Sequence, residues 1–217
     1  MLTTSFRDGI LNTLRATDLT QWVGYVGLIK GITDFRAGTV TEAAYTGYGT
    51  RPSAAFGAPA DTSPAGGRQI ANSGAVTFPQ NTGSSEDEIA YGLWTAATAG
   101  TLKAIGFLDA DPPVMGAVVD TTADQIVAAA HGMSADHRVF VLAAPGAVLP
   151  GGVSENTAYY VGTVPDSDHF TLSTTPANAN PVNITTRGAA LFMPYTPVTV
   201  AASATPQFAI GAIVFQL

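Results

Sequence analysis

The feature that most constrains this fold is a series of short β-prone runs separated by breaks rich in glycine, proline and asparagine. No helical pattern alternates with these runs, so a parallel α/β sheet is not expected. Several short strands at this spacing predict an all-β protein built as a jelly roll, a β-sandwich or a similar closed architecture. The runs lie at residues 22–29, 44–48, 75–78, 89–94, 102–108, 198–200 and 208–215, and a long loop with an embedded strand is expected from 52 to 74.

The segment from 120 to 192 differs from its surroundings and predicts a second domain. It holds all three histidines, and tight-turn sequences separate its β-prone runs. We expect a small β-barrel or sandwich of about seventy residues, inserted at a loop tip, where an insertion has a low entropic cost. The base domain then consists of residues 1–119 and 193–217. The runs of the insert lie at 125–128, 138–142, 158–163, 169–173 and 182–185.

The N-terminal residues are the exception to the β pattern and predict one short helix over about residues 5–16. Ser5 is placed to cap it, and Phe6, Ile10 and Leu14 recur at helical spacing on one face. An amphipathic helix buries its apolar face against its own sheet or against a neighbouring subunit. Phe6, Ile10 and Leu14 are therefore candidate interface residues.

The scarcity of charge limits what the chain binds. Charged residues make up 12% of the chain, about half of the usual share. A surface so poor in charge suits a protein that is covered in an assembly better than a free monomer. The nine lysines and arginines are scattered singly and the net charge is −7, so nucleic-acid binding is not expected.

Other absences in the sequence exclude further classes of protein. Without cysteine there is no disulfide framework and no thiolate metal site. No apolar run approaches the roughly 18 residues that a membrane-spanning helix needs. The N-terminus lacks the basic and apolar regions of a secretory signal. We expect neither membrane insertion nor secretion.

Three stretches in the first half resemble a family of tailed-bacteriophage virion proteins. The stretches are Tyr48-Gly49-Thr50-Arg51 within residues 45–51, Asn72-Ser73 followed by Val76-Thr77-Phe78-Pro79, and the run 89–102 with its Ala96-Ala97-Thr98-Ala99-Gly100 turn. The family is labelled tail-fibre-like, minor tail or capsid decoration protein. In this chain two residues, rather than one, separate the tyrosine from the arginine. The resemblance covers roughly residues 1–114 and 195–217.

The middle segment resembles a second phage element, a β display or spacer module found inserted in tail and fibre proteins, with no known catalytic set. Five pieces of its pattern occur here in order. They are His131-Gly132-Met133, Val139-Phe140, Leu149-Pro150-Gly151-Gly152, Tyr159-Tyr160-Val161 and Phe170-Thr171-Leu172-Ser173.

These resemblances imply a non-enzymatic structural component of the virion, made in the bacterial cytoplasm and assembled on the exterior of the capsid or tail. The implied partners are the major capsid or tail proteins, and the implied self-association is a symmetric homo-oligomer, with a trimer favoured. The inserted domain would project outward. No cofactor is implied.

The histidines raise the alternative of a metal site. His131, His137 and His169, with Asp136 or Asp168, are ligand types that zinc accepts. Their spacing matches no compact zinc motif, and both His131 and His137 lie at turns, where side chains hydrogen-bond backbone groups. We therefore expect structural roles and no metal ligands.

A polysaccharide depolymerase is one alternative function, and it would need a pair of opposed carboxylates. The densest acidic stretch, Glu86-Asp87-Glu88, follows Gly83-Ser84-Ser85 and predicts an exposed loop. No nucleophile elbow or phosphate-binding loop accompanies a strand–helix unit. We therefore expect no enzymatic activity.

A host-surface adhesin, which binds a glycan or a protein, is the other alternative function. Aromatic rings stack on sugars, and Trp22, Tyr91, Trp94, Tyr159 and Tyr160 are the candidates. The tryptophans lie in runs of bulky residues, which favours core packing. Tyr159 and Tyr160 alternate across a strand, so only one of them faces the core. This pair is the candidate contact site.

Overall fold

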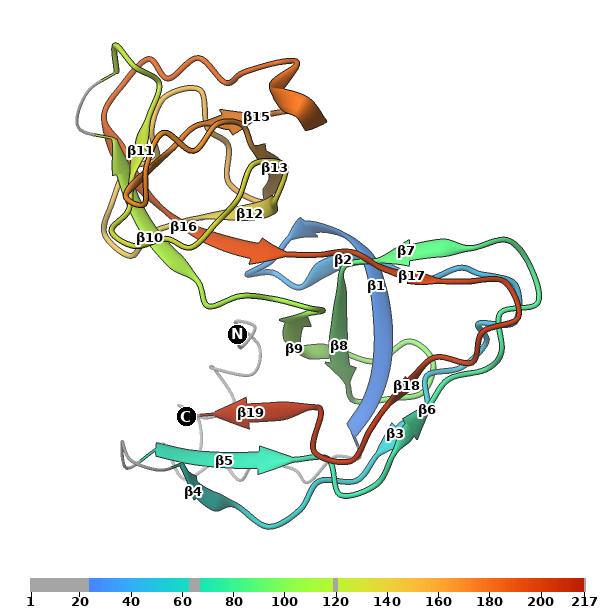
Figure 1. The fold of residues 1–217 in the computed structure, drawn as a ribbon. Helices are drawn as coiled ribbons and strands as arrows, with labels where there is room; N and C mark the ends of the chain where they lie inside the picture. The colour runs from blue at the N-terminus through green and yellow to red at the C-terminus, as the bar shows by residue number, and fades with distance from the viewer. Residues whose placement is uncertain (1–23, 63–66, 119–120, 217) are drawn as a thin grey trace. The chain divides into compact units, whose positions relative to one another are not determined.

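The computed structural model describes residues 24–62, 67–118 and 121–216 (Figure 1). Within these ranges the prediction of an all-β protein is confirmed, since the described helical structure is one 3-10 turn at Pro176–Asn178. The expected N-terminal helix with Phe6, Ile10 and Leu14 lies outside the described residues, as does Trp22. The chain divides into two compact units. The first comprises the described residues up to Gly106 and from Val198 onward, and the second is Phe107–Pro197.

The main sheet of the first unit is antiparallel around a long central strand. Strand β1 (Gly24–Asp34) pairs with β2 (Thr39–Glu42), β3 (Ser53–Ala54) and β8 (Ala90–Trp94), and β8 neighbours β9 (Leu102–Phe107). Apolar side chains of this sheet join others from the rest of the unit in one core. That core includes Val26, Leu28, Tyr45, Val76, Phe78, Leu93, Ala104, Val200 and Ile213.

A pair of facing glycines makes room for Trp94 in this sheet. Gly27 of β1 lies opposite Gly92 of β8. A Cβ atom at Gly27 would lie 2.7 Å from Cζ3 of Trp94, and one at Gly92 would lie 2.5 Å from the same atom. Glycine inside a strand often marks a close approach of this kind. The indole therefore occupies space that any other residue type at these positions would fill.

Three short strand pairs complete the first unit. Strands β5 (Gly67–Ala71), β6 (Val76–Thr77) and β7 (Glu86–Glu88) pair in turn with β19 (Val214–Gln216), β18 (Gln207–Phe208) and β17 (Val198–Val200), and β4 (Ala60–Thr62) flanks β5. We call residues 198–216 the C-terminal segment. In Figure 1 this red segment runs antiparallel along the chain from β7 back to β5.

The second unit is a seven-strand sheet that curls into a nearly closed barrel (Figure 1). Strands β14 (His169–Phe170) and β15 (Leu172–Ser173) are separated only by Thr171, yet β14 pairs with β11 (Ile126–Val127) and β15 pairs with β13 (Thr157–Val161). This stretch therefore joins the two ends of the sheet and leaves little free edge. The remaining strands are β10 (Val114–Val118), β12 (Arg138–Ala143) and β16 (Gly188–Tyr195).

The barrel encloses its own apolar core. Val139 and Val141 of β12, Phe170 of β14 and Phe192 of β16 are all fully buried in it. The second unit extends beyond the predicted insert of residues 120–192 at both ends, because β10 and the last residues of β16 are paired members of its sheet. That this unit is an inserted domain with its own origin stays a prediction.

Several expected strands differ from the observed ones. Residues 44–48 form a turn in which the Tyr48 N–H donates to the Tyr45 carbonyl. The expected strand 208–215 is divided by a turn at Ala209–Ala212, in which Gly211 has a φ of +78°. Residues 182–185, an expected strand, do not form one. Residues 86–88, expected to be a loop, form strand β7. Local hydrogen bonds close the two turns, whereas residues 182–185 and 86–88 hydrogen-bond residues distant in sequence, which a local pattern does not contain.

Substitution of Gly92 by alanine tests the packing of Trp94. The new Cβ would meet Trp94 and, at 2.7 Å, Leu102, so we expect Gly92→Ala to lower the free energy of unfolding by about 1–3 kcal/mol. Gly74→Ala is the matched control, because a Cβ there meets nothing within 4 Å. Urea denaturation of both variants makes the comparison. Equal stability of the two variants would contradict this account of the glycine pair.

Candidate functional site

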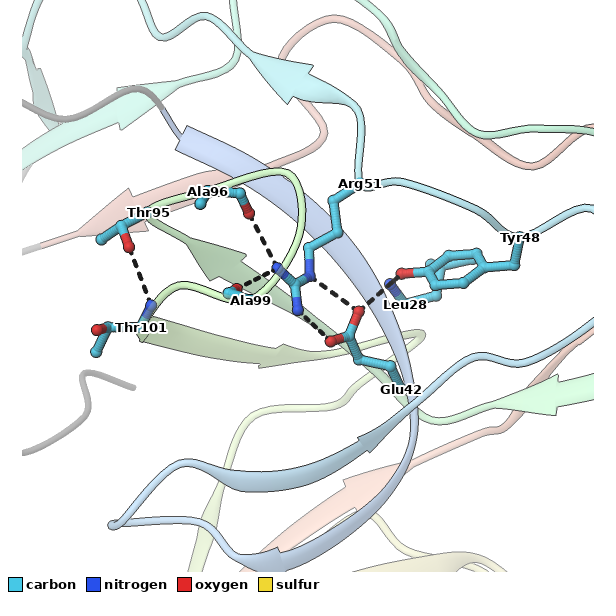
Figure 2. Close-up of polar contacts among 8 residues, drawn as sticks. All are labelled: Leu28, Glu42, Tyr48, Arg51, Thr95, Ala96, Ala99 and Thr101. Atoms are coloured by element: carbon cyan, nitrogen blue, oxygen red, sulfur yellow. Dashed lines mark hydrogen bonds and ion pairs between the residues drawn. The ribbon is translucent and has the colours of Figure 1, made fainter.

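The most connected polar group of the first unit is the buried guanidinium of Arg51, shown in Figure 2. Its Nε donates to Glu42 Oε2 at 2.9 Å, and a second nitrogen pairs with Glu42 Oε1. The third nitrogen donates to the carbonyls of Ala96 and Ala99 at 2.9 and 2.7 Å. The guanidinium carbon lies 4.2 Å from the centre of the Trp94 ring. This fork-shaped cation thus connects β2, β8 and the turn after β8.

Tyr48 completes the same cluster from the other end of its motif. Its hydroxyl donates to Glu42 Oε2 at 3.3 Å and accepts the Leu28 N–H at 3.1 Å (Figure 2). Burial, and then the nearby Glu42 carboxylate, raise the pKa of Tyr48. The ring stacks near Phe78, which comes from a separate motif. Tyr48 and Arg51, despite their unusual separation, therefore meet on one carboxylate.

The alanine-rich turn after β8 supplies the carbonyls that Arg51 needs. Ala99 and Gly100 have φ values of +51° and +76°, a conformation that glycine adopts at low cost. The Thr95 hydroxyl accepts the Thr101 N–H at 3.0 Å and holds the turn closed (Figure 2). The turn directs the carbonyls of Ala96 and Ala99 inward. The positive φ of Gly100, where a Cβ would also lie 2.9 Å from Ala96, explains the glycine of the Ala-Ala-Thr-x-Gly sequence.

Asn72, from the second motif, holds one turn of the C-terminal segment. Its backbone N–H donates to the Ile213 carbonyl and its carbonyl accepts the Gly211 N–H. Its side-chain nitrogen donates to the carbonyls of Ala209 and Gly74, both at 2.8 Å, and its side-chain oxygen accepts the Ile213 N–H. Asn72 is buried, so each of these bonds replaces one to water.

Asn81 repeats this arrangement nine residues later. Its backbone N–H donates to the Ala204 carbonyl and its carbonyl accepts the Ser203 N–H. Its side-chain nitrogen donates to the carbonyls of Val200 and Ser84 at 3.1 and 2.8 Å. Ser203, like Gly211 in the first clamp, has a positive φ. The sequences Asn72-Ser73-Gly74 and Asn81-Thr82-Gly83 therefore form two similar clamps on the C-terminal segment, although the side-chain oxygen of Asn81 accepts from Gly83 of its own loop.

The prediction that Glu86-Asp87-Glu88 forms an exposed loop is wrong, because these residues are strand β7. Glu86 accepts the N–H groups of Ala44 and Tyr45 at 2.6 and 3.0 Å and pairs with Lys30 at 2.9 Å. Asp87 stays exposed, as expected, and accepts from a threonine of β17. Glu88 is fully buried. Two distant backbone N–H groups and Lys30 stabilise the carboxylate of Glu86, and the stretch pairs with β17.

Glu86 and Glu88 have opposite pKa shifts. Burial and the neighbouring Glu86 carboxylate raise the pKa of Glu88 to about 8. Burial alone would raise the pKa of Glu86, but its hydrogen bonds from Ala44 and Lys30 outweigh that effect and lower it. Burial, followed by the two carboxylates, raises the pKa of Tyr45 to about 12. Two carboxyls with separated pKa values are typical of acid–base catalysis. However, the carboxyl of Glu88 has no surface open to a polysaccharide.

The candidate contact tyrosines of the second unit lie on opposite faces of β13. Tyr159 is buried in the barrel core, and its hydroxyl accepts the Ser154 N–H at 2.9 Å. Tyr160 is half-buried on the other face, where Arg138 lies 5.4 Å from the centre of its ring. Tyr159 is therefore not available to a partner. A contact role for Tyr160 stays a prediction.

The side chains of His131 and His169 take part in local hydrogen bonds. His131 is buried, and its Nδ1 accepts the Met133 N–H at 3.0 Å. His169 Nδ1 lies 2.8 Å from Asp166 Oδ1 in an exposed turn, and this contact lowers the pKa of Asp166. His137 Nε2 lies 4.0 Å from a carboxylate oxygen of Asp111. In the described ranges, no three histidine, aspartate or glutamate side chains converge as metal ligands would.

Sequence reasoning missed the central roles of Glu42, Asn81 and Glu88. The recurrence of Asn-Ser/Thr-Gly nine residues apart is the one signal that indicates the paired clamps. Of the other aromatic candidates, Trp94 is buried as expected and Tyr91 packs against Phe208.

Among the described residues, no helix is long and apolar enough to cross a bilayer.

Comparison with known proteins gives one family. Residues 2–128, more than half of the chain, match the family model Gp80, described as podophage GP4 fiber I protein gp80. The matched range contains the Arg51 cluster, Asn72, Asn81 and β7. A search of curated proteins found no match.

Replacement of Arg51 tests whether its cluster holds the first unit together. Arg51→Met keeps the apolar part of the side chain but leaves Glu42 without its guanidinium partner and two turn carbonyls without their donor. We expect a loss of about 2–4 kcal/mol in unfolding free energy, somewhat below the cost for a fully buried pair because Glu42 is partly solvated. Urea denaturation measures it. A loss below about 1 kcal/mol, the value of an ordinary surface pair, would contradict the central role of Arg51.

Glu88 predicts a pH dependence of stability. Its pKa is raised in the folded state, so the folded state retains a proton that the unfolded state releases above its ordinary pKa of 4.5. Stability is therefore lost as pH rises from about 4.5 to about 8, by at most about 1.4 kcal/mol per pH unit. We expect Glu88→Gln to remove this part of the pH dependence in thermal denaturation.

Asp87→Asn is the control for this measurement, because Asp87 lies on the same strand and faces solvent. It should keep the pH dependence of the unsubstituted protein. If Glu88→Gln and Asp87→Asn gave the same dependence of stability on pH, the buried carboxyl of Glu88 would not be the cause of that dependence.

Proposed function

The chain belongs to the podophage fiber I protein family, and from this premise we propose that it is a non-enzymatic structural subunit of the phage tail fibre. The description of the family favours a fibre position over decoration of the capsid. We propose that the subunit self-associates and attaches to other tail proteins on the exterior of the particle. Its low share of charged residues supports such an assembly, because few charges have to be desolvated when subunits cover each other.

The observation that carries this proposal is that the polar groups of the motif residues bind partners inside the protein. Arg51, Asn72 and the turn at 96–100 direct their polar groups at backbone and side-chain partners within the first unit. Catalytic sites commonly gather titratable groups in an open cleft. Here the most perturbed carboxyl, that of Glu88, is fully buried. This arrangement supports a scaffold whose shape, rather than its chemistry, is the function.

The second unit supports a division of roles within the subunit. The family match ends at residue 128, so most of the barrel lies beyond it. A nearly closed sheet exposes little backbone edge, which suits a module that does not take part in strand pairing between subunits. We therefore propose that the first unit assembles and that the barrel projects outward.

Immunogold labelling of intact particles tests the proposed position. Antibodies raised against the barrel should label the tail fibres, because the proposal places this unit on the outside of the fibre. Particles that lack the chain are the control for non-specific labelling. Gold over the capsid lattice, or chain that is present in the lysate but absent from purified particles, would contradict the proposal.

A further inference from the structure

The exposed apolar side chains of the first unit gather on one stretch of chain. Among its described residues, the large hydrophobic side chains that are exposed are Val198, Ile210 and Val214, at 42%, 69% and 40%. All three belong to the C-terminal segment. Isolated exposed apolar residues are ordinary. Here three lie on one segment and none lies elsewhere in the described part of the unit, which is typical of an interaction surface.

Each of the three strands of the C-terminal segment is also an outer strand. Its strands β17 and β18 each belong to a two-stranded pair, and β19 is at the end of the order β19-β5-β4. In the described part of the chain, no strand pairs with the opposite edge of this segment. Its outward backbone groups are therefore positioned to pair with another strand.

This edge lacks the charged residues that commonly protect an exposed strand edge against pairing. Proteins protect exposed edges with charged residues, especially lysine, or with proline. No aspartate, glutamate, lysine, arginine or histidine follows Arg187, so the segment carries no charged side chain. Pro206 lies between β17 and β18 and interrupts the edge once. The strand residues on either side of it, 198–200 before it and 207–208 and 214–216 after it, remain open to pairing.

The segment is held rigidly in place. Asn72 and Asn81 each bind its backbone through both main-chain and side-chain hydrogen bonds, at the two turns that separate its strands. A strand that is already ordered loses little conformational entropy when it binds a partner. The clamps therefore present a preformed edge.

We propose that the outer edge of the C-terminal segment is the surface through which a second copy of this chain binds. The inference rests on the proposed function, in which fibre subunits self-associate. Two copies that each carry a net charge of −7 repel each other unless they meet where charge is absent. The C-terminal segment offers such a surface, and a strand edge is complementary to a copy of itself. Within residues 198–216 themselves an oppositely charged partner would find no charged side chain to pair with.

A charge-insertion experiment on the full chain tests this surface. The variant Ile210→Lys with Val214→Lys places two cations on the edge. The variant Met115→Lys with Val148→Lys is the matched control, since these side chains are 54% and 79% exposed but lie in the second unit. We expect the unsubstituted chain and the control to form the same oligomer in light scattering and sedimentation. The dissociation constant of the oligomer should be at least about 100-fold higher for the edge variant. Its circular dichroism should be unchanged.

A second measurement needs no variant. Backbone amides of residues 198–216 in the unsubstituted chain should exchange hydrogen more slowly at high protein concentration than at low concentration, while peptides from the barrel should not change. A monomer at all concentrations, an edge variant as oligomeric as the control, or exchange that is independent of concentration in this segment would overturn the inference. Immunogold labelling of the fibre would be unaffected by these outcomes, so failure of the edge is distinguishable from failure of the proposed function.

Discussion

The first unit depends on the burial of one guanidinium. Arg51 donates to Glu42 on β2 and to two carbonyls of the turn after β8, and it lies over Trp94. A buried cation is tolerated only where its donors are satisfied, so the strand, the turn and the indole have to stand in fixed positions around it. Trp94 in turn requires the facing pair Gly27 and Gly92. The geometry of the main sheet follows from this set of requirements.

Buried polar side chains also hold the C-terminal segment to the rest of the first unit. After the barrel, the chain returns and pairs with a segment more than a hundred residues earlier in the sequence. Its short strands provide few hydrogen bonds, and the two asparagine clamps supply the remainder at the turns. Glu86 performs a comparable task between β7 and the turn at Ala44 and Tyr45. Buried side chains thus satisfy the backbone groups that strand pairing leaves without partners.

The sequence predicted much of the fold because short strands leave a local pattern. Residues 198–200 form a strand with the expected bounds, and the buried position of Trp94 follows from its bulky neighbours. Strand β7 was not predictable in this way, because three consecutive acidic residues have low β-propensity. Its order depends on Lys30, Ala44 and Tyr45, which are more than forty residues away in sequence.

The motifs allowed recognition of the family before their physical role was visible. Tyr48 and Arg51 could be paired from the sequence, but Glu42, the carboxylate on which both converge, belongs to no motif that the sequence displays. The asparagine of the second motif could be identified, while its partners at Ala209 and Ile213 depend on the return of the chain. Local sequence indicates which residues are constrained, and the tertiary structure determines which partners constrain them.

A cryo-electron-microscopy map of the purified particle, at a resolution that shows side chains, would locate both the chain and its Arg51 cluster. We expect fibre density into which the first unit fits with Arg51 enclosed by Glu42, the turn carbonyls and Trp94, in several copies around the fibre. Density for the chain in the capsid lattice, or fibre density that lacks this buried cluster, would contradict this expectation.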